Sequence, residues 1–305
     1  MDTTTHVAEA SKRLSRYKRA ETPPAMVLTE RDKEIVKSVY TYRLLTCGQV
    51  ETLLFSPDGN QDHPTKTSIC RKRLKLLYQH EYLDRIHLPI VPNQGSRPVV
   101  YCLAEQGAQL VANEQGVERP SVAWRRKDND VDIYFLDHSL RINDVRIAVT
   151  LSAKRDGWVL TRWVTERELK SLGERVRDPA RPDRSLPIAP DAYFTLERGD
   201  KRASFFLEVD QATEANKRFK AKIQAYLVYV TSGAYQERYQ TKSLRVLTVT
   251  TGEKRVVNLK STTEKVEGSD FFWFTTFDLA TAEGFLTAPI WRIAGQDGQY
   301  ALFTA

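Results

Sequence analysis

The chain has 305 residues, 41% of them hydrophobic and 10% aromatic, so it is long enough to form two domains with substantial cores. Its formal net charge of +7 suits a polyanionic partner such as nucleic acid. No apolar run approaches the roughly 18 residues of a membrane-spanning helix, and the polar N-terminus lacks the apolar segment of a secretory signal, so we expect neither a membrane partner nor export. Cys47, Cys70 and Cys102 show no paired spacing, which favours buried thiols in a reducing cytoplasm over disulfides or a zinc site.

Residues 1–25 are predicted to form a flexible basic arm. The cations of this arm are Lys12, Arg13, Arg16, Lys18 and Arg19, and two prolines follow them. A solvated tail without a function fits the same composition.

Residues 26–115 are predicted to form a compact DNA-binding unit. Thr29 and Thr46 are suited to cap the first two helices, and a third helix is expected over residues 64–80. Two extended runs, YLDRIHL and RPVVYCL, then indicate a hairpin, and a last helix is expected over residues 104–113. Three helices followed by a hairpin is the order of a winged helix-turn-helix.

The third helix is predicted to turn a cationic face outward. At about 100° per residue, its apolar side chains gather on one side, and cations mixed with hydrogen-bonding side chains gather on the other, as a helix in the DNA major groove requires. With one hairpin residue added, the expected DNA contacts are Lys66, Thr67, Ser68, Arg71, Lys72, Lys75, Gln79 and Arg97. Ile69 and Arg73 fall on the apolar side, where we expect Arg73 to snorkel or to form an internal ion pair. An ordinary solvated helix face is the alternative.

Residues 114–131 are polar and charged, and they are the best candidate for a domain boundary. Residues 132–305 are predicted to form a second domain, an α/β sandwich whose mixed sheet carries helices on its faces. Helices are expected over residues 137–153, 166–172, 213–229 and 253–265, strands over residues 157–165, 188–196, 203–210, 243–251 and 270–277, and a Pro/Arg-rich loop over residues 175–185. The aromatic run FFWF in the last strand is expected to be core.

Three carboxylates lie at the ends of two neighbouring predicted strands. Asp191 opens the first strand, while Glu208 and Asp210 end the second, two residues apart and therefore on one face. Mg²⁺ is typically held by one or two carboxylates plus phosphate and water. A site for Mg²⁺ or Mn²⁺ that activates water against a phosphodiester is therefore one interpretation, and a solvated sheet end is the other.

The helix that follows the second strand carries polar side chains along one flank of its apolar stripe. These side chains are Thr213, Lys217, Lys220 and Gln224. That flank could face the carboxylates and stabilise the charge of a scissile phosphate.

Two resemblances follow from these residues. Asp191 after Pro190, then Glu208, on a strand–turn–strand followed by a helix, resembles the core of the PD-(D/E)xK nucleases. Over roughly residues 28 to 250 the chain also resembles the replication-relaxation family of plasmid and other mobile-element proteins. The matching stretches are RKRLKLLYQHEYLDRI, VVYCLAEQGAQLV, DHSLRINDVRIAV, PDAYFTL and FFLEVDQAT with its downstream lysine and Tyr226. This second resemblance implies a winged-helix N-terminus and a restriction-endonuclease-like C-terminal domain.

The chain departs from the nuclease motif at one position. The motif has a lysine two residues after the glutamate, where this chain has Asp210. That change removes a cation that would stabilise the transition state. Either Lys220 substitutes for it from the helix, or the site is a remnant. Glu166 could be a further ligand but better fits a surface glutamate at a helix start.

Three functions remain open at this point. The resemblance implies a protein that binds duplex DNA as an accessory or regulatory factor in plasmid replication, relaxation or mobilisation. The alternative is an endonuclease dependent on Mg²⁺ or Mn²⁺ that its winged helix directs to DNA, with Lys220 on the phosphate and the metal held by Asp191, Glu208 and Asp210. A transcriptional repressor is the third. The expected partners are double-stranded DNA and the replication or mobilisation machinery of the element, with a homodimer left open.

Overall fold

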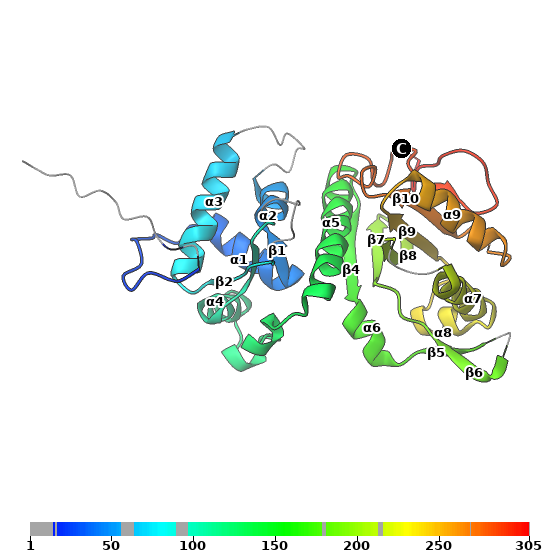
Figure 1. Cartoon of the computed structure of the whole chain (residues 1–305), viewed down its shortest axis with the longest axis horizontal. Coiled ribbons are helices and arrows are strands. Elements are labelled where there is room, and N and C mark those ends of the chain that lie inside the picture. The colour runs from blue at the N-terminus through cyan, green and yellow to red at the C-terminus, as the bar shows by residue number, and fades with distance from the viewer. Residues whose placement is uncertain are drawn as a thin grey trace, which may run out of the picture. The chain divides into compact units, whose positions relative to one another are not determined.

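The structure is a computed structural model that describes residue 15 and residues 17–55, 64–89, 97–178, 181–212, 216–268 and 270–304. The described residues divide into two compact units, one formed by residues before Asp132 and the other by residues from Asp132 onward (Figure 1). The expected boundary segment 114–131 lies at the end of the first unit.

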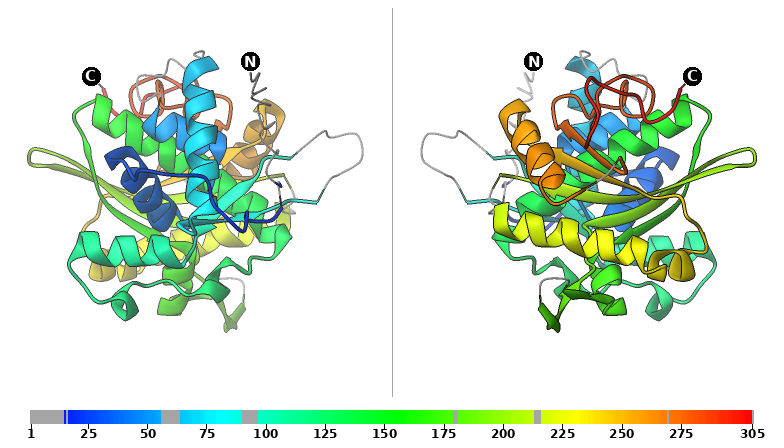
Figure 2. Two further views of the ribbon diagram at one scale, coloured as in Figure 1. Left: turned by 90° about the vertical axis from the view of Figure 1, so that its left-hand side faces the viewer. Right: turned by 90° about the vertical axis from the view of Figure 1, so that its right-hand side faces the viewer.

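Unit 1 combines helices with a small antiparallel sheet. Its elements are α1 Glu30–Tyr42, β1 Leu44–Thr46, α2 Cys47–Leu54, α3 Pro64–Gln79, β2 Leu83–Ile86, β3 Val100–Leu103 and α4 Glu105–Gln115, with short 3₁₀ turns at Arg119–Ser121 and Arg126–Asn129. The strands pair in the order β1-β3-β2, with β3 antiparallel to both neighbours. The predicted hairpin is confirmed as β2 and β3 (Figure 2, left), and its tip, residues 90–96, lies outside the described residues. Strand β1 was not predicted, because a run of three residues is too short to show a period.

The first two helices of unit 1 begin where the sequence predicts. The hydroxyl of Thr29 accepts a hydrogen bond from the main-chain N–H of Asp32, and the Asp32 carboxylate accepts one from the main-chain N–H of Thr29. Thr46 and Gln49 form the same reciprocal pair at the start of α2. Each pair satisfies two main-chain donors that a helix start leaves without partners, which confirms both threonines as N-caps.

The described end of the expected arm is attached to unit 1. The guanidinium of Arg19 donates to the main-chain oxygen of Tyr78 at 2.8 Å and forms an ion pair with Asp84 at 2.8 Å. The main chain of Ala20 donates to the side chain of Gln79 at 2.7 Å. These contacts place the segment along the end of α3 and the start of β2.

Unit 2 is built on one mixed sheet. Its elements are α5 Ile133–Arg155, β4 Val159–Thr165, α6 Glu166–Leu172, β5 Arg175–Asp178, β6 Arg181–Pro187, β7 Ala192–Arg198, β8 Lys201–Asp210, α7 Asn216–Thr231, α8 Ala234–Tyr239, β9 Arg245–Thr250, α9 Glu253–Glu264, β10 Phe272–Thr276 and β11 Arg292–Ile293. Six strands pair in the order β11-β10-β9-β8-β7-β4, with β8, β9 and β10 parallel and the outer pairs antiparallel. The chain is therefore of mixed α and β class.

The alternation of side chains along β8 separates two cores. Phe205, Leu207 and Val209 pack on the core that includes α5. Phe206 packs on the other core with α7, α8 and α9, which lie on one face of the sheet (Figure 2, right). The sequence predicts this division, and it places Glu208 on the side of Phe206. The FFWF run is buried core, as expected, with Phe272 and Phe274 fully buried.

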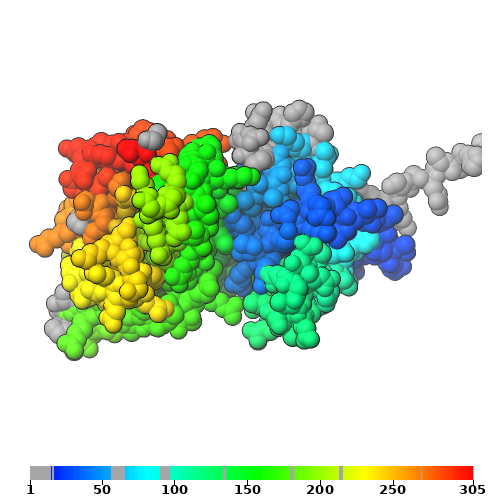
Figure 3. All heavy atoms as spheres, turned by 180° about the vertical axis from the view of Figure 1, so that it is seen from behind, coloured from blue at the N-terminus to red at the C-terminus, as the bar shows by residue number. Residues whose placement is uncertain are grey.

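The prediction of a Pro/Arg-rich loop over residues 175–185 is wrong. Strands β5 and β6 pair there in an antiparallel hairpin, with Val176 opposite Leu186. These two side chains are buried against the core that α7 covers, and this burial orders the hairpin. Figure 3 shows this segment at the surface, along the lower edge beneath α7 and α8.

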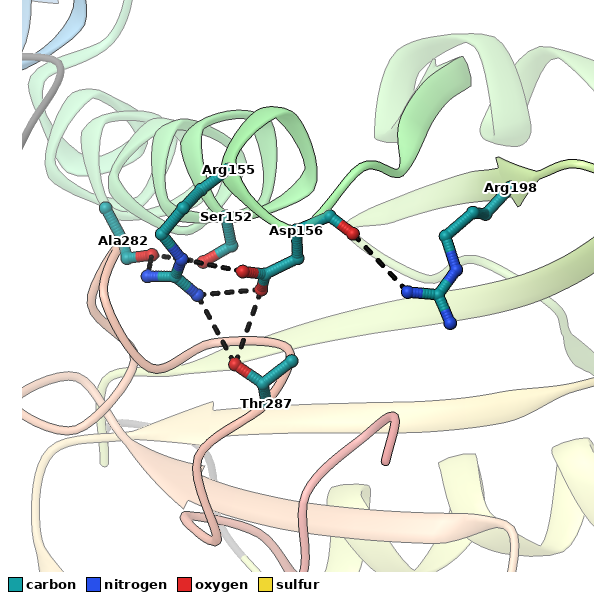
Figure 4. Close-up of polar contacts among 6 residues, drawn as sticks. All are labelled: Ser152, Arg155, Asp156, Arg198, Ala282 and Thr287. Atoms are coloured by element: carbon teal, nitrogen blue, oxygen red, sulfur yellow. Dashed lines mark hydrogen bonds and ion pairs between the residues drawn. The ribbon is translucent and has the colours of Figure 1, made fainter. Parts of the chain in front are cut away.

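Polar contacts fasten the C-terminal end of α5 to the segment around residues 282–287 (Figure 4). Arg155 pairs with Asp156 at 2.7 Å and donates to the main-chain oxygen of Ala282 at 2.8 Å, to which Ser152 also donates. Arg198 donates to the main-chain oxygen of Asp156 at 3.5 Å. The helix that covers one face of the sheet is thus anchored at its end.

Among the described residues, none of the helices combines the length and the apolar character that crossing a lipid bilayer requires.

Candidate functional site

The cationic side chains predicted on α3 are mostly solvent-exposed. Ser68, Arg71, Lys72 and Lys75 are exposed, and Lys66 and Thr67 are partly buried. The hydroxyl of Thr67 donates to the carboxylate of Glu51 on α2. Helix α3 contains no acidic residue, so its exposed side is positively charged. Arg97 is half-buried just before β3.

Two predictions about the faces of α3 are wrong. Gln79, expected on the outer face, is 1% exposed, because the segment around Ala20 covers the end of the helix and donates to the Gln79 side chain. Ile69, expected to face inward, is 44% exposed near the start of the helix. A helical wheel takes no account of a covering segment, which explains the error at Gln79; nothing in the structure explains the exposure of Ile69.

Arg73 forms the internal ion pair that the sequence predicts as one of its options. Its guanidinium binds both oxygens of Asp32 on α1, with Nε 2.7 Å from Oδ1. Burial alone would raise the pKa of Asp32, but hydrogen bonds from Arg73 and Thr29 outweigh it and hold that pKa below its ordinary value. This pair joins the helix that carries the cationic face to the first helix of unit 1.

In unit 2, the main chain brings Asp191 beside Glu208. Asp191 directly precedes β7, and its N–H donates to the main-chain oxygen of Leu207 at 3.0 Å. Its carboxylate Oδ2 accepts from the N–H of Val209 at 2.7 Å. Asp191 therefore bridges the two residues that flank Glu208 on β8. The predicted proximity of these two acids is observed, and both are at least 94% buried.

Glu208 is held by two side chains of α7. The amine of Lys222 lies 2.7 Å from Oε2, and the hydroxyl of Tyr226 donates to Oε1. Burial raises the pKa of Glu208 to about 7; the charge of Lys222 opposes this rise, and the charge of Asp191 adds to it. Glu208 is therefore a carboxyl group that can carry a proton near neutral pH.

The lysine that contacts Glu208 is Lys222, and not Lys220, which the sequence analysis suggested for the phosphate. Lys220 is exposed. At about 100° per residue, Lys222 lies four residues before Tyr226 and so on nearly the same face of α7, whereas Lys220 lies about 120° away. A closer use of the same spacing would have found Lys222.

Asp210 does not join the other two carboxylates. Its two oxygens bind the guanidinium of Arg255 on α9, at 2.8 and 2.9 Å, and the hydroxyl of Thr250 donates to it at 2.6 Å. Burial would raise the pKa of Asp210, but the hydrogen bonds from Arg255 and Thr250 lower it below its ordinary value. The predicted cluster thus separates into an Asp191–Glu208 pair and a distinct Asp210–Arg255 ion pair.

His138, which the sequence analysis did not count among the site residues, belongs to the site. Its Nε2 donates to Oδ1 of Asp191 at 3.0 Å, from α5. Burial lowers the pKa of His138, but the hydrogen bond to Asp191 and the nearby charges of Glu166 and Glu208 outweigh it and raise that pKa. Glu166 itself starts α6 and pairs with Lys170, as a helix-start glutamate does. The DHSL stretch within the family resemblance was the available signal for His138.

Asp191, Glu208 and Asp210 are the residues that could hold Mg²⁺ or Mn²⁺. Their hard oxygens are of the right chemical type. However, both oxygens of Asp191 and both of Glu208 already accept hydrogen bonds from protein groups, and Asp210 is occupied by Arg255. Across the residues that the structure describes, no group of three or more histidine, cysteine, aspartate or glutamate side chains is placed to hold a metal ion. In this arrangement the carboxylates are therefore occupied by protein groups, and a divalent cation would have to displace Lys222, Tyr226 or Arg255 to bind them.

Comparisons with known proteins add a family match. The family model described as Replication-relaxation matches residues 36–244. Among solved structures, the chain is similar to restriction endonuclease FokI at 8% identity and a TM-score of 0.31, over 83% of this chain and 43% of that chain. A structure of FokI bound to DNA gives 9% identity and a TM-score of 0.26, over 85% of this chain and 45% of that chain. The chain thus spans less than half the length of FokI, and no curated protein gives a significant match.

Proposed function

Because the chain belongs to the replication-relaxation family, we propose that it binds duplex DNA as an accessory protein in the replication, relaxation or mobilisation of a plasmid or other mobile element. In this proposal unit 1 is a winged helix-turn-helix, and α3 is the helix that enters the major groove. The expected partners are double-stranded DNA and other proteins of the same element.

One observation carries the proposal: the exposed side of α3 presents Arg71, Lys72 and Lys75 with no acid on the helix. Lysines there would contact phosphates and supply affinity without sequence preference. Arg71 has the two-pronged guanidinium that pairs with guanine, so it is the candidate for base preference. The ion pair between Arg73 and Asp32 supports the proposal, because it holds α3 against α1 while the cationic side stays open.

Unit 2 is proposed as a scaffold that shares the nuclease architecture. Asp191, Glu208 and Asp210 are each matched by a protein donor, and two of them by a full cation, Lys222 or Arg255. Such pairs stabilise a fold most when their charges stay matched.

The test is duplex binding by the full chain, measured by fluorescence anisotropy over a range of salt concentrations. The double variant Lys72→Ala/Lys75→Ala should weaken binding roughly tenfold or more and lower the slope of log K against log salt by about 1.8, as expected for two lost phosphate contacts. A matched control, Arg126→Ala/Lys127→Ala, removes two exposed positive charges elsewhere in unit 1 and should leave the slope unchanged. An unchanged slope in the α3 variant would overturn the assignment of this helix.

A second candidate function, endonucleolytic cleavage, is favoured by one specific observation. The amine of Lys222 lies beside Glu208, so Lys222 could take the role of the motif lysine, whose position is held by Asp210 in this chain. Supercoiled DNA would be incubated with the protein, with Mn²⁺ or with a chelator. Cleavage that needs the metal and disappears in Asp191→Ala would replace the scaffold proposal for unit 2. Intact supercoiled DNA in every arm would exclude the second candidate.

A further inference from the structure

Two cysteines meet at the contact between α2 and α3. Cys47 is the first residue of α2, Cys70 lies in the middle of α3, and their sulfur atoms are 3.9 Å apart. The Cys70 sulfur also lies 3.8 Å from the main-chain oxygen of Cys47. Both thiols are free. The helix that carries the cationic face is thus in sulfur-to-sulfur contact with its neighbour.

The surroundings of Cys47 are those of a reactive thiol. It lies at a helix N-terminus, where main-chain N–H groups and the helix dipole favour a thiolate. A hydrogen bond with the Cys70 thiol lowers the pKa of Cys47 to about 7. Burial raises this pKa, and the positive charge of Arg71 lowers it further. The side chain is only partly buried, so a small oxidant can reach it.

Cys70 has the complementary character. It is fully buried, and its hydrogen bond with Cys47 and its burial raise its pKa well above the ordinary value. It therefore stays protonated beside the reactive thiol. Cys102 is the natural comparison within unit 1, because burial raises its pKa to about 12 and it is 1% exposed.

We propose that Cys47 and Cys70 are a dithiol pair that forms a reversible disulfide between α2 and α3, with Cys47 as the thiol that reacts first. The oxidant belongs to the class of hydroperoxides, with hydrogen peroxide as the simplest.

The chemistry is balanced in two steps. The Cys47 thiol loses its proton, and the thiolate attacks one peroxide oxygen. The O–O bond breaks, and the leaving hydroxide takes up that proton as water, which gives a sulfenic acid at Cys47. The Cys70 sulfur then attacks the Cys47 sulfur, the S–O bond breaks, and the Cys70 proton leaves with the hydroxide as water. Two thiols and one peroxide thus give one disulfide and two waters. A dithiol reductant reverses the reaction by thiol–disulfide exchange.

The disulfide has a consequence for α3, which rests on the proposed DNA-binding function. A disulfide bond is about 2 Å long, so the two sulfurs must approach by roughly 2 Å. Rotation of the two side chains supplies part of this approach, and we expect a shift of α3 against α2 to supply the rest. Arg71 and Lys72 follow Cys70 directly, so this shift moves the cationic face. We expect the oxidised protein to bind duplex DNA at least about threefold more weakly than the reduced protein.

The disulfide is tested on the reduced full chain with one equivalent of hydrogen peroxide. Free thiols are then blocked by alkylation, and the protein is digested with trypsin. Cys47 and Cys70 lie on different tryptic peptides, residues 44–66 and 67–71, so the disulfide appears as a linked pair two hydrogens lighter than their sum. Cys102→Ser should form it normally, and Cys47→Ser and Cys70→Ser should not. Oxidation of Cys47 to a sulfinic acid without the linked pair, or linkage through Cys102, would overturn the proposal.

Measurements of duplex binding distinguish the Cys47–Cys70 disulfide itself from the proposed DNA-binding function, on which the regulatory effect of the disulfide rests. Reduced and oxidised protein are compared at equal salt, with Cys47→Ser under both conditions as the control for peroxide damage. A loss of affinity in the wild type alone, restored by dithiothreitol, supports the proposal. A disulfide that forms while the affinity stays the same overturns the regulatory consequence. A disulfide in a protein that binds no duplex in either state overturns the proposed function and leaves the disulfide pair established.

Discussion

The amine of Lys222 lies 2.7 Å from the carboxylate of Glu208, so a cation on α7 reaches a carboxyl group that β8 buries inside unit 2. The two residues are 14 positions apart in sequence, and the fold joins them. Lys222 supplies a positive charge that partly offsets the cost of burying this carboxylate.

Removing the cation should therefore destabilise unit 2. In Lys222→Ala, Glu208 keeps its burial but loses its counter-charge. We expect a loss of about 1–3 kcal/mol in the free energy of unfolding at pH 8; this is less than for a fully buried pair, because the lysine side chain is 35% exposed. Urea denaturation followed by circular dichroism measures it. Lys220→Ala is the matched control on the same helix, with an expected change below about 0.5 kcal/mol. Equal effects from the two variants would contradict the assignment.

Glu208 should make stability fall as the pH rises. Burial raises its pKa to about 7 in the folded protein from an ordinary value of 4.5. A raised folded-state pKa means that the folded protein holds the proton more tightly, so this contribution is complete below about pH 4.5 and is lost by about pH 7. Glu208→Gln should therefore gain stability relative to the wild type across this window, by about 3 kcal/mol at most. Free energies of unfolding for both proteins at closely spaced pH values test this. A difference that does not change with pH would show that Glu208 titrates normally.

Arg73 should be essential to the stability of unit 1. Asp32 is fully buried, so Arg73→Ala leaves a carboxylate without its counter-charge at a cost of about 3–5 kcal/mol. Arg71→Ala removes an exposed guanidinium two residues earlier and should cost far less. A double-mutant cycle with Asp32→Asn measures the coupling, which we expect to exceed 1 kcal/mol. Additive effects would mean that the pair is not energetically coupled.

Gly107 is required by a close approach between α4 and the chain before β2. A Cβ atom at this position would collide with the main-chain oxygen of Tyr82, which cannot rotate away. Gly107→Ala should therefore lower the stability of unit 1 by about 1–3 kcal/mol. Gly48→Ala in α2 is the control, because its nearest neighbour atom would be 4.0 Å away and alanine favours a helix. Thermal unfolding should give shifts of opposite sign.

Much of the fold follows from local patterns, because hydrophobic period and capping chemistry are local. The threonine caps at Thr29 and Thr46 and the alternation of Phe205 and Phe206 place whole elements correctly. The site is less predictable, because it depends on which element covers which. The segment that buries Gln79 lies 59 residues away in sequence, and His138 reaches Asp191 across 53 residues. Arg255 on α9 forms an ion pair with Asp210 on β8, and no local sequence pattern indicates that these two elements are neighbours.

The sheet of unit 2 ends in two strands that are poor templates for adding another strand. On one side β11 has only two residues, and on the other β4 has an irregular register between Leu160 and Arg162. Short or irregular outer strands, and charges on them, discourage edge-to-edge pairing between protein molecules. The six-stranded sheet of unit 2 is therefore a poor partner for a strand of a second molecule, and we expect any self-association through this sheet to be disfavoured.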